Sequence, residues 1–289
     1  MKTIEDIIAC EVDAVAAAPI AACADVMRRH FGPKTAAVIF YGGALRDPAP
    51  DPLLDFYVLV DDLSVLAHPV ARVGAWLLPP TVYFMTVTDG PAVHRCKVAV
   101  MTAHDFAKGM TAFAPHLWAR FSQAVSVAYL RDAATRMRVI DALSAAVRRT
   151  ADSVRPLMPP IYTAHELWTR AFSESYAAEL RPERTSRAAE IANTPRFGAL
   201  SAAMFGADRK RSAARARVAW GLRRPWGKFL NALRLMKAAF TYDGGLDYAV
   251  AKIARHSGVK VAVRDSDRRV PLLGGIRIFV EAWRRGGVR

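Results

Sequence analysis

The chain of 289 residues has only three cysteines, Cys10, Cys23 and Cys96. Three widely separated cysteines cannot form the disulfide framework of a small secreted domain, and no Cys-x-x-Cys pair is present to hold zinc. The seven histidines also lack metal-ligand spacing, and no serine or cysteine lies in a nucleophile-elbow pattern. The sequence therefore argues against hydrolases and zinc enzymes, and we expect reduced thiols, mostly in the core.

Long uninterrupted apolar runs are also missing. Hydrophobic residues make up 53% of the chain, enough to bury a substantial core, but charges or prolines interrupt every candidate for a membrane-spanning helix. The N-terminus carries Glu5 and Asp6 and lacks the basic start and continuous apolar stretch of a signal peptide. We therefore expect a cytoplasmic chain without a transmembrane anchor.

The strongest bulk signal is a net charge of +15. A field of this size attracts nucleic acid, anionic lipid or phosphorylated substrates, and its sign alone does not choose among them. Between Arg209 and Lys237 there are ten Lys or Arg residues and no acid, interleaved with Trp220, Trp226 and Phe229. Cations mixed with aromatic rings suit the head-group region of an anionic membrane. A solvated basic face or an RNA-binding surface fits the same charges.

Strand and helix signals divide the chain into two unlike halves. We expect a buried strand over 35–41, another over 54–60, and a hairpin built from 82–88 and 96–101. From residue 103 onward the pattern is helical, and prolines near 156–160 interrupt it. The sequence predicts an α+β fold: a nucleotidyltransferase-like domain over 1–155, a helical domain over 156–270 and an amphipathic tail over 271–289.

The order strand, Gly-Gly, loop and acidic strand is the sequence form of a polymerase-β-like nucleotidyltransferase core, a small mixed sheet with helices. Glycines let the backbone approach a triphosphate, and carboxylates on the next strand hold a divalent cation that bridges the phosphates. The candidate nucleotide-binding residues are Tyr41, Gly42, Gly43 and Arg46, and Asp55 is a candidate metal ligand. A plain turn followed by an acid at a strand end explains the same pattern.

The second carboxylate of this superfamily is missing from its usual place. An Asp-x-Asp pair puts two acids on one strand face, but the alternate position here is Tyr57. Asp61 has the parity of Asp55 and is the other candidate metal ligand, although it lies about 20 Å along an extended strand. Both acids can bind one ion only if the strand bends. Otherwise Asp61 and Asp62 are turn or cap residues.

Several segments resemble one family. Tyr-Gly-Gly-Ala at 41–44 and the stretch 54–62 are similar to the Tyr-Gly-Ser and Asp-Phe-x-x-x-Val-Asp-Asp motifs of mitochondrial-type phosphatidate cytidylyltransferases. Residues 97–101 look like the family's Lys-Tyr-Gly-Val strand. The remaining similar segments belong to its helices: 117–121, 127–131, 166–168 and 175–181. Order and spacing agree over roughly residues 35–200. The chain departs from the family at two places. Gly43 stands where the family often has Ser, and Val98-Ala99 stands where the family has Tyr-Gly.

The resemblance implies Mg²⁺-dependent transfer of a cytidylyl group from CTP to phosphatidic acid, giving CDP-diacylglycerol and pyrophosphate. Carried over by position, it implies that Gly42 and Gly43 cradle the triphosphate and that Asp55 binds Mg²⁺. Lys97 would neutralise phosphate charge. Such a transfer depends on alignment and charge neutralisation more than on covalent chemistry.

Other arginines are candidates for binding the phosphate or lipid head group. Arg95 alternates with Lys97, so one strand face would carry two cations. Arg181, Arg184 and Arg187 recur at helical spacing and are candidates for a basic stripe facing the cleft. Plain surface charge explains these three arginines equally well.

The C-terminal tail has the form of a short interfacial helix. Ile276, Val280 and Trp283 can line one face, with arginines supplying cations, and the resembling family has a C-terminal membrane-binding helix. A helix that packs on the body of the protein fits the same pattern. We therefore expect a peripheral protein on the inner face of a membrane, with an anionic membrane surface as partner and no stable protein partner.

Two alternatives stay open at the level of sequence. One is a nucleotidyltransferase acting on another acceptor such as tRNA, for which the positive charge is equally suitable. The other is an inactive lipid- or nucleic-acid-binding protein, which the tyrosine at position 57 makes plausible.

Overall fold

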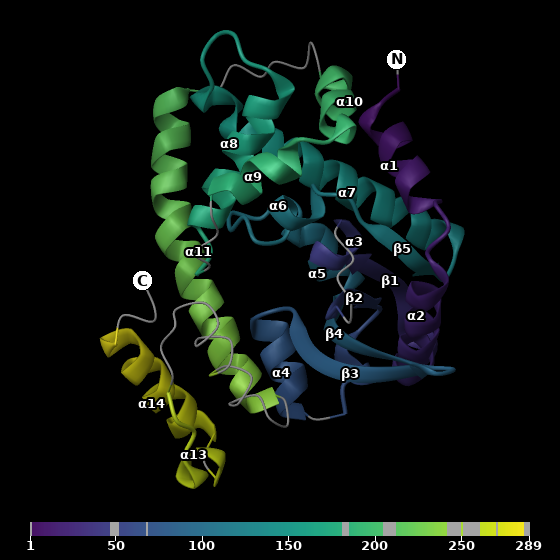
Figure 1. The fold of residues 1–289 in the computed structure, drawn as a ribbon, viewed down its shortest axis with the longest axis vertical. Helices are drawn as coiled ribbons and strands as arrows, with labels where there is room; N and C mark the ends of the chain where they lie inside the picture. The colour runs from purple at the N-terminus through teal and green to yellow at the C-terminus, as the bar shows by residue number, and fades with distance from the viewer. Residues whose placement is uncertain are drawn as a thin grey trace.

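The computed structural model describes residues 2–46, 52–67, 69–180, 185–204, 212–241, 250, 261–269 and 271–285. Its centre is a five-stranded mixed sheet in the order β3-β4-β2-β1-β5 (Figure 1). The strands are β1 (Thr35–Tyr41), β2 (Leu54–Val60), β3 (Thr81–Asp89), β4 (Ala92–Thr102) and β5 (Ser126–Leu130). The fold class is α+β, as the sequence predicts. The expectation of helix from residue 103 onward is wrong at 126–130, because this segment pairs with β1 as an edge strand of the sheet.

Helices surround this sheet, and a helical half follows it. The first half contains α1 (Ile4–Val12), α2 (Ala18–Phe31), α3 (Gly43–Arg46), α4 (Pro69–Leu77), α5 (Ala103–Gly109), α6 (Trp118–Phe121) and α7 (Ala133–Val154). The second half contains α8 (Ala164–Ala177), α9 (Thr185–Ala192), α10 (Pro195–Ala203), α11 (Ala213–Thr241), α13 (Asp265–Arg269) and α14 (Pro271–Arg284). Short 3-10 turns are η1 (Gly32–Lys34), η2 (Leu63–Val65) and η3 (Arg155–Leu157).

The pairing of the strands combines both directions. β1 is antiparallel to β2 and β5, whereas β2 and β4 are parallel. β3 and β4 form the predicted antiparallel hairpin, which is longer than the sequence suggests because pairing continues to Asp89 and Ala92. Gly90 has a φ of 57° in the two-residue turn, a conformation that two-residue hairpin turns demand.

Both faces of the sheet are covered, which is why β1 and β2 read as continuous apolar runs. Alternate residues such as Ile39 and Tyr57 face α1, α6, α7 and α8, and belong to the larger core. Their neighbours, such as Phe40 and Phe56, face α2 and α4 and belong to a second core. Asp55 shares the strand face of Tyr57 by parity, so it points to the side that carries the helical half.

The predicted helical domain is packed directly on the first. The larger core runs from Ile4 to Trp220 and includes residues of α8, α9 and α10, so the segments 1–155 and 156–270 share one core. The chain does break near the prolines, because α7 gives way to η3 and α8 begins anew with a capping box between Thr163 and Glu166. In the part of the chain that the structure describes, no helix combines the length and apolar character needed to cross a bilayer.

Candidate functional site

A pocket opens where β1 ends, between the sheet and the helical half. It encloses about 110 Å³, and its lining comes from the end of β1, α3, the start of β2, β4, the region of α6 and the end of α8. The lining residues are Tyr41, Gly42, Gly43, Arg46, Asp55, Lys97, Ala119, Arg120, Gln123, Ala124, Ser175, Tyr176 and Glu179. The structure thus brings together all six residues that the sequence proposed for nucleotide binding and catalysis.

Gly42 forms the turn that closes one side of the pocket. Its φ of +100° is a conformation that L side chains rarely adopt, and a Cβ there would lie 3.0 Å from Asp55 Oδ2. Tyr41 and Asp55 are directly paired across β1 and β2, so the turn passes close over the carboxylate. Because Gly42 has no side chain, the backbone of the turn can lie in close contact with the Asp55 carboxylate.

Asp55 and Lys97 form the charged centre of the pocket. They are neighbours in the parallel register of β2 and β4, and Lys97 Nζ lies 2.8 Å from Asp55 Oδ1. Their side chains are 25% and 19% exposed, so the ion pair is partly withdrawn from water yet reachable from the pocket. A phosphate and a divalent cation could each engage one member of this pair.

Two arginines extend the positive charge of the wall. Arg46 donates from Nη1 to Gln123 Oε1 at 2.7 Å, which orients it toward the pocket region. The Arg120 guanidinium lies 3.7 Å from Glu179 and 5.5 Å from the centre of the Tyr41 ring. Burial raises the pKa of Tyr41 to about 12, so its hydroxyl stays neutral at physiological pH.

Tyr57, at the position of the missing second carboxylate, packs in the core, and its hydroxyl accepts a hydrogen bond from Arg120 at 3.4 Å. It is buried, and its ring meets Tyr41 edge-on at 5.1 Å and Phe121 at 4.9 Å between centroids. A second carboxylate enters the pocket from a different element, because Glu179 follows α8. The sequence pattern does not single out Glu179 or Arg120 as site residues, although both fall in segments, 175–181 and 117–121, that carry the family resemblance.

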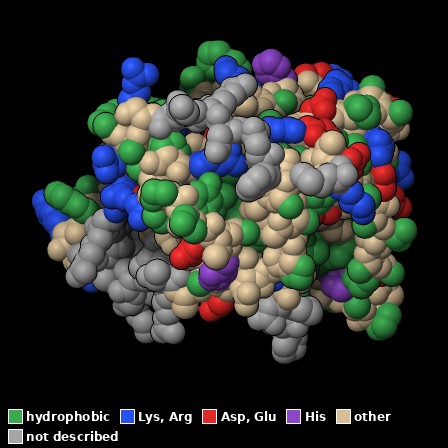
Figure 2. All heavy atoms as spheres, turned by 90° about the horizontal axis from the view of Figure 1, so that it is seen from above, with side chains coloured by type: hydrophobic (Ala, Val, Ile, Leu, Met, Phe, Trp, Pro, Cys, Tyr) green, Lys and Arg blue, Asp and Glu red, His purple; other side chains and the backbone are tan. Residues whose placement is uncertain are grey.

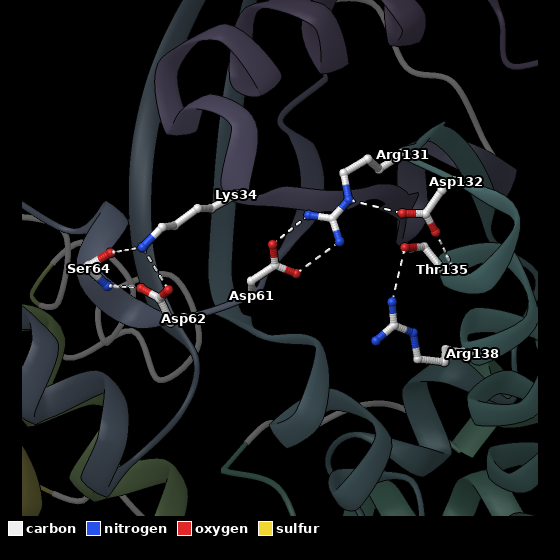
Figure 3. A network of polar contacts seen from close by, with 8 residues as sticks. All are labelled: Lys34, Asp61, Asp62, Ser64, Arg131, Asp132, Thr135 and Arg138. Carbon is white, nitrogen blue, oxygen red and sulfur yellow. Dashed lines mark hydrogen bonds and ion pairs between the residues drawn. The ribbon is translucent and has the colours of Figure 1, made fainter.

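Asp61 is not brought to Asp55. β2 keeps a regular parallel register with β4 along its whole length, so Asp61 remains beyond the opposite end of the strand. There it binds Arg131 through two contacts, of 2.5 and 3.1 Å (Figure 3). Asp62 caps η2, and Lys34 together with Ser64 holds the pKa of Asp62 below its ordinary value. Asp61 and Asp62 therefore form ion pairs, with Arg131 and Lys34, at the end of β2 that lies away from the pocket.

The remaining candidate residues are more dispersed. Arg95 lies on β4 opposite Thr86, exposed and outside the pocket lining. Arg181 and Arg184 lie outside the described residues. On α14, Val280 and Trp283 are exposed, whereas Ile278 and Ala282 pack with Leu235 of α11. The side chain of Ile276 is likewise not described.

The donor set of the pocket suits Mg²⁺. Asp55 and Glu179 supply carboxylates and Ser175 a hydroxyl, which are the hard oxygen donors that Mg²⁺ prefers. Among the residues described, no three His, Cys, Asp or Glu side chains gather as a complete metal site. Mg²⁺ commonly binds through one or two carboxylates together with substrate phosphates and water, and Asp55 and Glu179 are the two carboxylates of the lining.

Comparisons with known proteins add no assignment. No model of a known protein family matches the chain, and a search of curated proteins gives no match.

Proposed function

We propose that the chain is a nucleotidyltransferase with a polymerase-β-like core, and that it transfers a cytidylyl group from CTP to phosphatidic acid. One observation carries the proposal. Residues of segments that resemble the cytidylyltransferase family line a single pocket together with Asp55: 41–43, 97, 119–120, 175–176 and 179. They are far apart in the sequence, and a chance likeness of separate short motifs gives no reason for them to meet.

The charges of the pocket suit a nucleoside triphosphate. Lys97, Arg46 and Arg120 can face the phosphates, while Asp55 and Glu179 can hold Mg²⁺. Bound Mg²⁺ would neutralise the charge that builds up on the phosphate oxygens. In the turn at 42–43, Gly43 leaves its backbone open to a phosphate, because nothing lies within 4 Å of a Cβ built there.

The proposed reaction is a substitution at phosphorus. A phosphate oxygen of phosphatidic acid attacks the α-phosphorus of CTP, and the bond from that phosphorus to the bridging oxygen breaks. The products are CDP-diacylglycerol and pyrophosphate, and the bridging electron pair leaves with pyrophosphate. In this proposal the residues of the pocket align the two substrates and neutralise phosphate charge. Lys97, which is paired with Asp55 in the structure, would turn toward a phosphate of the bound nucleotide.

Because the proposed acceptor is a lipid, the enzyme would act at a membrane surface. We propose that this is the inner face of the membrane. Exposed tryptophans support this: Trp226 on α11 and Trp283 on α14 are the type of side chain found at the head-group boundary. The acyl chains then stay in the bilayer while the head group enters the pocket.

The proposal is tested by pyrophosphate release from each of the four nucleoside triphosphates, with Mg²⁺ and phosphatidic acid vesicles. We expect release with CTP, reduced at least ~10²-fold by Asp55→Asn or Lys97→Met, as for the loss of a charge-stabilising group. Asp61→Asn is the matched control, since it makes the same change just beyond the opposite end of β2, at the Arg131 contact. Equal damage by Asp55→Asn and Asp61→Asn would contradict the assignment of the site.

The same assay distinguishes phosphatidic acid from tRNA as the acceptor. The net charge of +15 also favours RNA, so tRNA replaces the vesicles in a parallel reaction. Release that depends on tRNA and ignores lipid would move the proposal to a tRNA-modifying enzyme. No release with any nucleotide and either acceptor, from protein that melts cooperatively, would indicate an inactive binding protein.

A further inference from the structure

Helix α11 presents an exposed apolar stripe. Four hydrophobic side chains lie at intervals of four, four and three residues, and on an α-helix such positions fall within an arc of about 80°. The stripe consists of Val218, Leu222, Trp226 and Phe229, which are 64%, 59%, 46% and 52% exposed. The rings of Trp226 and Phe229 contact each other in a tilted arrangement, with 5.7 Å between their centroids. Soluble surfaces rarely show apolar side chains so aligned without a partner for them.

Cations accompany the stripe. Arg217 and Lys228 lie on the flank of α11 next to the stripe, and the helix carries no acid. Figure 1 shows α11 as a long helix at the edge of the molecule. In Figure 2, which keeps left and right unchanged, basic and hydrophobic side chains mix toward the left, while most acidic side chains lie in the right half. An apolar stripe with cations beside it is the form of an interfacial membrane helix.

The opposite face of α11 touches the wall of the pocket. Gly227 packs so closely on α8 that an added Cβ would lie 2.4 Å from the Ala178 carbonyl oxygen, and Ala178 precedes the pocket residue Glu179. Arg224 also binds Glu174 of α8 at 2.6 Å. A surface that contacts the stripe is therefore separated from this wall by about the thickness of one helix, roughly 10 Å.

We infer that the stripe of α11 docks the protein on an anionic membrane. This inference rests on the proposed function for its choice of lipid as the partner. A second copy of the chain is the weaker choice, because the cations beside the stripe would repel their counterparts across a symmetric contact. Nucleic acid is weaker too, because the centre of the stripe is aliphatic and aromatic while its cations lie to one side.

The test is binding of the full chain to phosphatidylcholine vesicles with and without phosphatidylglycerol, without nucleotide. Leu222→Glu should lower partition into the anionic vesicles at least tenfold, about 1.4 kcal/mol, and the uncharged Leu222→Gln about threefold, about 0.65 kcal/mol. Val15→Glu is the matched control, since Val15 is exposed between α1 and α2, and should stay within twofold. These side chains are exposed, and thermal melting checks that each variant is folded.

The possible outcomes test the docking surface and the proposed reaction independently of each other. Unchanged vesicle binding by Leu222→Glu, or a dimer in light scattering that this substitution dissociates, would overturn the docking inference. Loss of vesicle binding with turnover retained on a short-chain, soluble phosphatidic acid would support it. If no nucleotide is turned over but Leu222→Glu still loses vesicle binding, the docking surface stands and the proposed reaction fails.

Discussion

Replacing Gly42 by alanine should damage both the fold and the pocket. The φ of +100° penalises any Cβ, at about 1–2 kcal/mol for a left-handed backbone conformation. The new methyl would also lie 3.0 Å from Asp55 Oδ2, and moving that side chain off its preferred rotamer costs about 0.5–1.5 kcal/mol. Together we expect Gly42→Ala to lower the free energy of unfolding by about 2–3 kcal/mol.

The adjacent glycine provides the control. Nothing lies within 4 Å of a Cβ at Gly43, and that residue begins α3. Gly43→Ala should therefore leave the free energy of unfolding unchanged or raise it by up to about 1 kcal/mol through helix propensity. Urea denaturation of the wild type and both variants measures the difference. Equal stabilities for the two alanine variants would refute the reasoning from backbone conformation.

Gly42→Ala has a second expected effect, on ligand binding. Displacing the Asp55 carboxylate disturbs its 2.8 Å contact with Lys97, so Mg²⁺-dependent nucleotide binding should weaken in Gly42→Ala more than in Gly43→Ala. Calorimetric titration with CTP and Mg²⁺, at a temperature where both variants are folded, measures this. Equal affinities would show that the turn supports the fold without positioning the acid.

Three further measurements address single groups. Glu179→Gln should weaken CTP binding about tenfold with Mg²⁺ and little in EDTA; equal losses in both would exclude a role in holding the ion. Cys10 is exposed while Cys23 and Cys96 are buried, so one thiol should react quickly with a disulfide reagent in the folded protein, and three fast thiols would contradict the packing. Because burial raises the pKa of Tyr41 to about 12 while an unfolded tyrosine ionises near pH ~10, stability should fall as pH rises above 10. Tyr41→Phe should lessen that loss, and identical alkaline profiles would contradict it.

The sequence predicted those parts of the site that local pattern determines. The strands β1 to β4, the turn at 42–43 and the position of Asp55 follow from apolar runs, paired glycines and alternation, and the structure has them in these places. The sequence prediction of helix was wrong at β5, because its strand conformation comes from pairing with β1, far away in the sequence. Lys97 could be related to Asp55 only through the parallel register of β2 and β4, and the family resemblance supplied it.

Other parts of the site depend on packing between distant segments. Glu179 reaches the pocket because α8 packs on the larger core, and no local pattern distinguishes it from the other acids of the helical half. Tyr57 looked like a lost ligand, but the ring contacts that bury it come from Tyr41 and Phe121. On α14, the pattern proposed an apolar face, while contact with α11 selects Ile278 and Ala282 for burial.

The parallel pairing of β2 and β4 also bears on how the protein folds. Asp55 and Lys97 are 42 residues apart, and parallel strands cannot be joined by a tight turn. Their contact must wait until the β3–β4 hairpin has formed and docked on β2, and such non-local pairing is slow. Glu179 is added only when the helical half closes over this edge. Nucleotide affinity should therefore develop late in refolding, after most of the helical circular dichroism has returned, and it would report the completed chain rather than any intermediate.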